Sequence, residues 1–468
     1  MKHTTKTVLA ATTAVLTAFI CQPTAQAQSI DALLDKLVEK GTLTTKEAKE
    51  LRAESDKDFS HAFKAKTGMP DWVTNLRLGG DVRLRYDGIY FDPATGTGTG
   101  VVDRNRVRYR MRAGITATML DDMEVGIRFT SAENKSTGNN GMGDPISGND
   151  TLTSNGSKKP LWIDLAYAKW QMLNRPDFSA TFIGGKMENP FTFSEIVFDP
   201  DYTPEGGALQ LGYHLNDQHS FKFNTGFFSL AEVGGSSHDS YLFGAQIRWE
   251  AVWNKQWSSS FGLSGLAISD RQNLTHAAAG ANPNVPDVSR GNTRPSAVGA
   301  PLSDFNPFIL DGSVTYTKES FPFYPGAFPI KLAGEYVNNP GGDSPGAQVY
   351  GKNRNTAYSI GMTLGKSGKK GTWDLTYKFK NLEANYWFEE LVDSDHGSFY
   401  QNAVGPNSFT AGYGAGTNLR GHYMRGAYSP TDSLTLSVNY YLFDLIDKPV
   451  GALSSTTGRI QIDAAWKF

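Results

Sequence analysis

Five arginines at every second position form a dense row of positive charge in this chain. They are Arg104, Arg106, Arg108, Arg110 and Arg112. Alternate side chains of a β-strand point to the same side, so an extended strand would place all five guanidinium groups on one face. The alternating positions from Val107 to Ile115 are apolar or aromatic and would take the opposite face. The row therefore predicts a strand with one charged and one apolar surface. Its guanidinium groups could bind negatively charged solutes or pair with carboxylates of the protein.

A second group of charges lies between residues 189 and 205, where acids alternate with aromatic residues. The acids are Glu195, Asp199, Asp201 and Glu205, and the aromatic residues are Phe191, Phe193, Phe198 and Tyr202. A loop so rich in aromatic side chains is better suited to packing inside a protein than to extending into water. We therefore expect this loop to fold inward and to bring its acids opposite the arginines. The alternative is an ordinary outer loop.

Motifs for catalysis and for metal or cofactor binding are weak. The segment Gly365-Lys-Ser367 suggests a phosphate loop, but position 360 is Ile rather than the required Gly. His214 and His219 flank Asp217 within an expected turn, which makes a poor metal site. No combination of Ser, His and Asp has a spacing that indicates a nucleophile. We predict no enzyme activity, no metal and no cofactor.

Alternation with a period of two continues from Trp72 almost to the last residue. We count about 16 strands of this kind, within a range of 14 to 18. Short turns, such as residues 120–122 and 254–256, alternate with long polar loops, such as 131–159 and 270–304. A barrel that crosses a membrane has tight turns on one side and longer loops on the other. A soluble β-sandwich has no reason to sort its loops in this way.

The final strand strengthens this interpretation. Apolar residues occupy every second position, and these are Ile460, Ile462, Ala464, Trp466 and Phe468. About ten residues that are apolar on one side suffice for one tilted strand to cross a bilayer. An arginine facing lipid at mid-membrane costs roughly 2–4 kcal/mol, so the arginine row must face inward. We predict an all-β transmembrane antiparallel barrel over 71–468, and we expect Trp466 and Phe468 to form its assembly signal.

Two segments precede the barrel. Residues 1–27 have early lysines, an apolar run and a small-residue site at 25–27, which predicts a cleaved secretory signal peptide. It contains Cys21, the only cysteine, so the mature chain has no thiol. Residues 28–70 change to helical spacing, and Thr44-Thr-Lys-Glu47 matches a capping box. We expect a short periplasmic helical or coiled-coil-like segment, which is either a spacer or plug or a site of self-association or cell-wall contact.

In these features the chain resembles the putative porin family of Gram-negative outer-membrane proteins. That family is in turn similar to the phosphate-selective porins. The likeness covers nearly all of the mature chain. The matching segments are 33–48, 80–86, 104–110, 185–191 and 198–206. The resemblance implies a pore without naming its solute, and we do not carry phosphate selectivity over to this chain.

The sequence-based hypothesis is a water-filled outer-membrane channel for passive diffusion of small hydrophilic solutes or ions. Its charged constriction would combine Arg83, Arg85, Arg108, Arg110 and Arg112 with Glu195, Asp199, Asp201 and Glu205. Two alternatives for the arginines stay open, namely pairing with inward acids such as Asp81, Asp87 and Glu124, and contact of Arg104 and Arg106 with lipopolysaccharide. The alternative function is a non-conducting barrel that serves as an adhesin or envelope link.

The expected partners are outer-membrane lipid and lipopolysaccharide, the barrel-assembly machinery, and further copies of the chain in a trimer. The net charge of -2 gives no reason to expect nucleic acid. The mean hydropathy of -0.39 is too polar for a helical membrane protein but fits a barrel in which every second strand residue faces a wet lumen.

Overall fold

The computed structural model describes most of the region after residue 69 and a few residues before it. The described ranges are 70–91, 103–134, 143–233, 237–275, 290–295, 299–342, 353–400, 411–413, 415–448 and 454–468, with 36–38, 40, 44, 46–47 and 50–51. The chain divides into two compact units, residues 1–73 and 74–468. The predicted signal peptide, 1–27, lies outside the described residues.

In the first unit, residues 36–38, 46–47 and 50–51 are helical. The predicted capping box is present: the backbone N–H of Thr44 donates to a Glu47 carboxylate oxygen at 2.8 Å, and the N–H of Glu47 donates to Thr44 Oγ1 at 3.2 Å. These reciprocal bonds satisfy backbone donors that a helix start leaves without partners. Among the described residues, no helix is long and apolar enough to cross a membrane.

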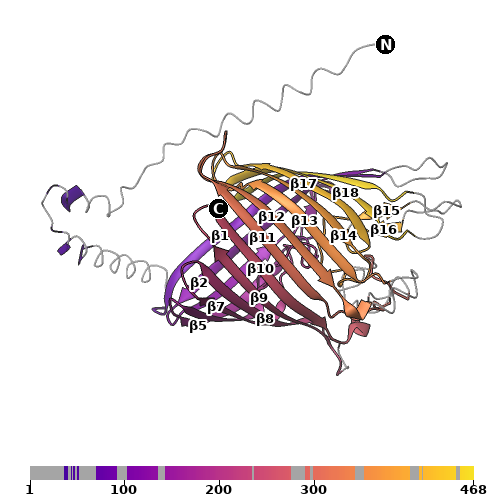
Figure 1. Cartoon of the computed structure of the whole chain (residues 1–468), viewed down its shortest axis with the longest axis horizontal. Coiled ribbons are helices and arrows are strands. Elements are labelled where there is room, and N and C mark those ends of the chain that lie inside the picture. The colour runs from indigo at the N-terminus through magenta and orange to yellow at the C-terminus, as the bar shows by residue number, and fades with distance from the viewer. Residues whose placement is uncertain are drawn as a thin grey trace, which may run out of the picture. The chain divides into compact units, whose positions relative to one another are not determined.

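The second unit is a closed antiparallel β-barrel of 16 strands, which confirms the predicted fold class and strand number. Figure 1 shows the strands tilted around the barrel. The wall strands are β1 Val73–Phe91, β2 Arg104–Met119, β3 Met123–Thr130, β5 Trp162–Asn174, β6 Phe178–Lys186, β7 Glu205–His214, β8 His219–Ala231, β9 Ser240–Val252, β10 Trp257–Ile268, β11 Phe308–Lys318, β12 Phe328–Asn338, β13 Thr356–Gly365, β14 Trp373–Leu382, β17 Leu419–Tyr428, β18 Leu434–Leu445 and β19 Thr457–Lys467.

Short elements lie in the long loops. They are β4 Asp150–Thr151, the hairpin of β15 Ser398–Tyr400 and β16 Ala411–Tyr413, and the 3₁₀ turns η1 Ser154–Gly156, η2 Arg271–Asn273 and η3 Pro340–Gly342. The β15–β16 hairpin lies at the right end of the barrel in Figure 1, whereas the C-terminus lies at the left end. This hairpin therefore lies at the end of the barrel opposite the C-terminus.

The barrel closes where β1 meets β19. Register partners include Val82 with Trp466 and Leu84 with Ala464. The last residue completes this seam, because Phe468 and Gly80 exchange two backbone hydrogen bonds of 3.1 Å. A Cβ on Gly80 would lie 2.2 Å from the Arg112 carbonyl oxygen, so only glycine fits at this point of the seam.

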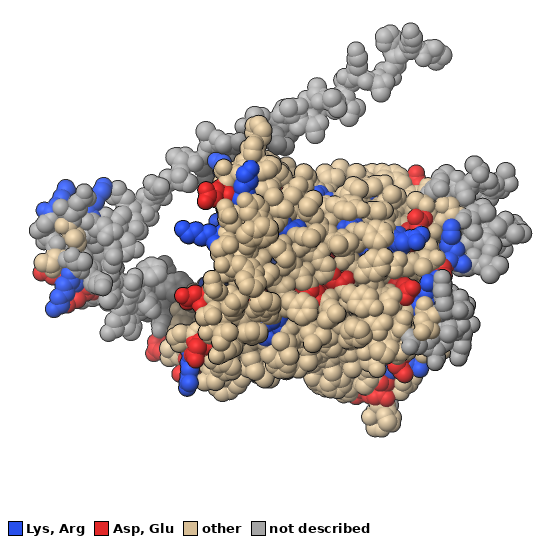
Figure 2. All heavy atoms as spheres, in the orientation of Figure 1, with Lys and Arg blue, Asp and Glu red and all other residues tan. Residues whose placement is uncertain are grey.

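In the barrel, apolar side chains are exposed on the outer face and polar side chains are buried on the inner face. Apolar residues of alternate positions are exposed on the outside, such as Leu78 at 74% and Ile462 at 48%, while Asp87 and Gln461 on the inner face are fully buried. In Figure 2 the belt between the two ends of the barrel carries few charges, and most Lys, Arg, Asp and Glu gather toward the ends. An exposed apolar belt around a charged interior is the arrangement that a strand barrel needs in a bilayer.

The turn between β2 and β3 shows how a tight connection is made. Asp121 and Asp122 both have positive φ, 63° and 57°. Two successive residues with positive φ are typical of a type I′ turn, whose twist matches that of the strands it joins, and aspartate tolerates this conformation better than most residues. The charged β2 and its neighbour β3 are therefore held in a fixed register at this end.

A charged neck inside the barrel as candidate functional site

Residues 187–204, which we call the neck loop, leave the wall after β6 and cross the barrel interior. The backbone N–H of Thr192 donates to Gln246 of β9 at 2.9 Å. The N–H of Ser194 donates to Glu335 of β12 at 3.2 Å. These strands lie on a different part of the wall from β6 and β7, which carry the loop's ends. The loop therefore packs inside the barrel, as its aromatic residues indicated.

Glu195 anchors the neck loop to β14. Its carboxylate lies 2.8 Å from the ammonium group of Lys378 and 3.0 Å from that of Lys380. Burial favours the neutral form, but the two lysines outweigh it and hold the pKa of Glu195 well below its usual range. The carboxylate thus stays ionised and fixes the loop through charge-assisted hydrogen bonds.

The returning arm of the loop meets the arginine row of β2. Asp201 lies 2.7 Å from Arg110 and 3.6 Å from Arg112. Asp81 of β1 lies on the other side of the same guanidinium groups, 2.9 Å from Arg110 and 2.6 Å from Arg112. The two arginines are therefore shared between an acid of the wall and an acid of the loop, and the contact with Asp81 is the wall pairing that the sequence offered as one alternative.

Asp199 has a different environment. Its oxygens accept backbone N–H groups from Asp201 and Ser394, each at 2.7 Å, and no cation pairs with it among the described residues. Burial and the nearby carboxyls of Asp201 and Asp393 raise the pKa of Asp199 well above its usual range. Asp199 therefore shapes the loop rather than extending the charge pairing.

A second segment, residues 383–397, also enters the barrel, and we call it the cover loop. Its Tyr386 and Trp387 are fully buried and donate hydrogen bonds to the neck-loop carbonyls of Ile196 (2.6 Å) and Val197 (2.9 Å). Aromatic side chains of the two loops belong to one apolar cluster. The two loops thus support each other, and we call the part of the barrel interior where they meet the inward-facing wall residues the neck.

The cover loop is also tied to the wall by charge. Asp395 lies 3.0 Å from Arg85 of β1 and 3.3 Å from Arg459 of β19. Burial raises the pKa of Asp395, but the two guanidinium groups and a hydrogen bond from Gln461 outweigh it and lower the pKa well below its usual value. Arg85 also binds Asp463 at 2.7 Å. Each loop therefore places at least one carboxylate against inward arginines or lysines of the wall.

The other expected site residues are more dispersed. Arg108 pairs with Glu133 at 3.2 Å, toward the outer end of β2. Glu205 is the first residue of β7 rather than part of the loop, and its largely exposed carboxylate lies 2.9 Å from Lys186. Arg83 donates a hydrogen bond to Asn149 at 2.7 Å. Trp466 and Phe468 lie on the outer surface, 40% and 66% exposed, away from the neck.

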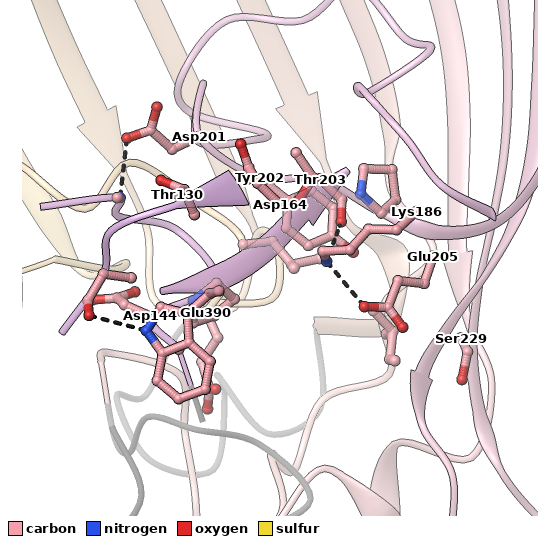
Figure 3. Close-up of a pocket in the computed structure, with 18 of the residues that line it drawn as sticks. Thr130, Asp144, Asp164, Lys186, Asp201, Tyr202, Thr203, Glu205, Ser229 and Glu390 are labelled. Carbon is pink, nitrogen blue, oxygen red and sulfur yellow. Dashed lines mark hydrogen bonds and ion pairs between the residues drawn. The ribbon is translucent and has the colours of Figure 1, made fainter. Parts of the chain in front are cut away.

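Three cavities lie in succession through the barrel. The first, of about 580 Å³, contains Arg112, Lys186 and Asp201, and Figure 3 shows Lys186 reaching toward Glu205 and Thr203 while Asp201 lies on the other side. A cavity of about 220 Å³ shares Asp201 with the first. A third, of about 310 Å³, shares Glu195 and Lys378 with the second. Neighbouring cavities therefore adjoin each other at these shared charged residues.

Several charged residues of the neck were not expected from the sequence. They are Lys378, Lys380, Asp393, Asp395, Arg459 and Asp463. Lys378 and Lys380 of β14, like Arg459 and Asp463 of β19, alternate with outward apolar side chains. The same alternation that revealed the arginine row could therefore have identified them as inward-facing residues. Among the described residues, no cluster of His, Cys, Asp and Glu is arranged to hold a metal ion.

The chain is similar to a known protein family and to solved structures. The family described as Putative porin matches residues 97–275, which confirms the resemblance noted in the sequence. No curated protein matches the chain. Among solved structures, the chain is similar to Salmonella typhi OmpF in complex with daunomycin, with 10% identity over 84% of this chain and 97% of that chain and a TM-score of 0.43. It is also similar to the high-pH structure of Pseudomonas putida OprB, with 10% identity over 84% of this chain and 94% of that one and a TM-score of 0.47.

Proposed function

We propose that this chain, whose family match and fold support an outer-membrane porin channel, lets small hydrophilic solutes and ions diffuse passively through a charged constriction. The observation that carries the proposal is a set of cavities that share the charged residues Asp201, Glu195 and Lys378 inside a barrel whose apolar side chains face outward. An interior lined by charged side chains is solvated and can conduct, whereas an apolar filling cannot.

We assign the constriction to the neck loop and the wall that faces it. Asp201 with Arg110 and Arg112 forms one side, and Glu195 with Lys378 forms the other. Opposite charges in close pairs leave a small net charge, so the preference for anions or cations stays mild. The same pairs produce a strong local field, which orients dipolar solutes. Salt screens such fields over about 8 Å at physiological ionic strength, so the field acts mainly on solutes within the neck.

The wider assembly belongs to the same proposal. Residues 1–27 would direct export and be removed, and residues 28–70 would remain in the periplasm. The outer belt would contact lipid and, at its rim, lipopolysaccharide, and the barrel-assembly machinery would insert the chain by way of its last strand. We also infer that three copies associate. Chemical crosslinking of the purified protein followed by mass measurement tests the trimer.

Conductance in planar bilayers tests the channel directly. The protein is purified, refolded in detergent and added at low concentration to one side of a membrane. Stepwise current increases of uniform size support a pore, and swelling of loaded liposomes in small neutral sugars supports diffusion of hydrophilic solutes. The absence of both in protein that is correctly inserted, as judged by resistance to unfolding in detergent at room temperature, refutes the proposal.

One observation favours a second candidate, a non-conducting barrel that acts as an adhesin or envelope link. Tyr386, Trp387 and Phe388 of the cover loop are at most 2% exposed and fill part of the interior with apolar side chains. A complete apolar seal would block water. Under this alternative, inserted protein shows no unitary current, but removal of the cover loop opens one.

A further inference from the structure

Most inward-facing arginines near the neck are paired with carboxylates. The shortest distance in each pair is 2.7 Å for Arg85, 2.8 Å for Arg106, 3.2 Å for Arg108, 2.7 Å for Arg110, 2.6 Å for Arg112 and 2.7 Å for Arg459. Arg83 of β1 differs, because no carboxylate of the described residues pairs with it. Its guanidinium donates one hydrogen bond, to the neutral side chain of Asn149.

The position of Arg83 makes this difference consequential. It lines the cavity of about 220 Å³ that shares charged lining residues with each of the other two cavities. Its Nε is shielded from solvent and finds no acceptor in the described part of the chain. A buried donor without a partner costs about 1–3 kcal/mol, so an oxygen atom that enters this cavity and accepts from the guanidinium is stabilised there.

Acidic residues also line the cavity, but their charges are already engaged. Glu195 is paired with Lys378 and Lys380, and Asp201 with Arg110 and Arg112. Asp393 lies 3.4 Å from Lys380, and Asp395 lies 3.0 Å from Arg85. Asp199 is held by two backbone N–H groups. Of the cations that line this cavity, Arg83 is the one without an ion pair to a carboxylate of the described residues, so its charge is the one that a solute can neutralise most directly.

The chemistry of the cavity indicates which solute would be retained. A guanidinium binds a carboxylate through parallel hydrogen bonds, more strongly than it binds a neutral oxygen. A solute with two negative charges would have one charge left over among several carboxylates, which is unfavourable. A solute with one negative charge neutralises Arg83 without leaving an excess.

We infer that Arg83 forms a transient binding step for small monocarboxylates in the middle of the channel. The inference rests on the proposed channel function and adds a substrate class to it. A binding step inside a pore makes the current saturate as the concentration of the bound ion increases, because each occupant must leave before the next one enters. Free diffusion through a wide pore shows no such saturation.

The test measures single-channel conductance in potassium acetate at increasing concentration. In the wild type we expect saturation, and we expect acetate to reduce the current carried by chloride. Arg83→Gln should raise the half-saturation concentration at least about tenfold, which corresponds to the loss of roughly 1.4 kcal/mol of binding. Arg83→Lys keeps the charge but not the planar group, so it should raise the half-saturation concentration by less.

Arg425→Gln is the matched control, because Arg425 also faces inward but is paired with Asp374 and does not line this cavity. It removes the same charge and should leave acetate saturation unchanged. If Arg83→Gln inserts poorly, Arg83→Lys carries the test alone.

Two results overturn the inference. One is a linear acetate conductance in the wild type, which is expected if only water occupies the cavity. The other is equal saturation in the wild type and both Arg83 variants. Either result leaves the channel proposal intact, whereas the absence of any unitary current in the wild type refutes the channel itself.

Discussion

Replacing Glu195 with glutamine should loosen the neck loop and make the channel noisier. Both Glu195 oxygens lie 2.8 Å from the Lys378 ammonium group, and Lys380 adds a contact of 3.0 Å. Glutamine keeps the size of the side chain and one acceptor oxygen but removes the charge. The variant therefore tests the anchor without changing the packing around it.

The magnitude follows from the burial of the three groups. Breaking a buried ion pair by changing one partner typically costs about 3–5 kcal/mol, because the remaining charge is left without a partner. Here the cost is smaller, because the Lys378 side chain is 28% exposed and Lys380, which is fully buried, keeps Asp393 at 3.4 Å. We expect about 2 kcal/mol, which raises the population of displaced loop conformations roughly 30-fold.

Single-channel recording measures this effect as open-channel noise and as the frequency of brief changes in conductance. The control is Glu205→Gln, which removes an equal charge from an exposed pair with Lys186 at the end of β7. Glu195→Gln should show frequent transitions and Glu205→Gln few. Identical recordings from the two variants would refute the view that Glu195 holds the neck loop.

The pKa of Glu195 adds a pH dependence with a defined sign. Its pKa is lower in the folded protein than the value of about 4.3 expected for an unfolded chain. The pair therefore contributes its full stabilisation above about pH 4.3, and the contribution is lost only as the pH falls through the lower folded pKa. The wild-type noise that depends on this anchor should stay constant from pH 8 down to about pH 5, whereas a rise near neutral pH would contradict the assigned pairing.

Three further changes have expected outcomes. Deleting Phe468 removes two backbone hydrogen bonds at the seam with Gly80, so exported protein should accumulate without insertion, and normal amounts of heat-modifiable barrel in outer membranes would contradict this. Deleting residues 29–55 should preserve unitary conductance while weakening association of copies, and complete loss of current in inserted protein would mean that the segment lines the pore. Replacing Arg108, Arg110 and Arg112 with alanine leaves Asp81, Asp201 and Glu133 with fewer cations, so the reversal potential in a salt gradient should shift toward cation preference, and an unchanged potential would make these arginines purely structural.

The barrel could be predicted from the sequence because the bilayer imposes a simple rule on every strand. An outward side chain must be apolar and an inward one can be polar, so the period of two in β2 and β19 directly indicated which face each residue occupies. The alternation of short and long connections then fixed the two ends. These signals are local in the sequence, and the closed sheet confirms what they predicted.

Partners across the barrel could not be predicted in the same way. Alternation showed that Arg110 faces inward, but the contact with Asp201 depends on how far the neck loop extends, which no local pattern specifies. The position of Glu195 beside Lys378 joins residues that are 183 positions apart. The cover loop had the same aromatic signal as the neck loop, in Tyr386, Trp387 and Phe388, but these residues come soon after the end of β14 at Leu382 and could equally have continued the strand.

The pairing of the lumen arginines bears on why the neck is charged at all. Buried ion pairs add little net stability, because the cost of removing both ions from water offsets most of their attraction. An apolar interior could hold the loops equally well, as the buried contacts of Trp387 with Phe198 and Phe305 already show. What apolar contacts cannot supply is a wet surface past which polar solutes can move. The charges are therefore better explained by passage than by stability. Arg83, with which no carboxylate in the described part of the chain forms an ion pair, is where that explanation is most directly tested.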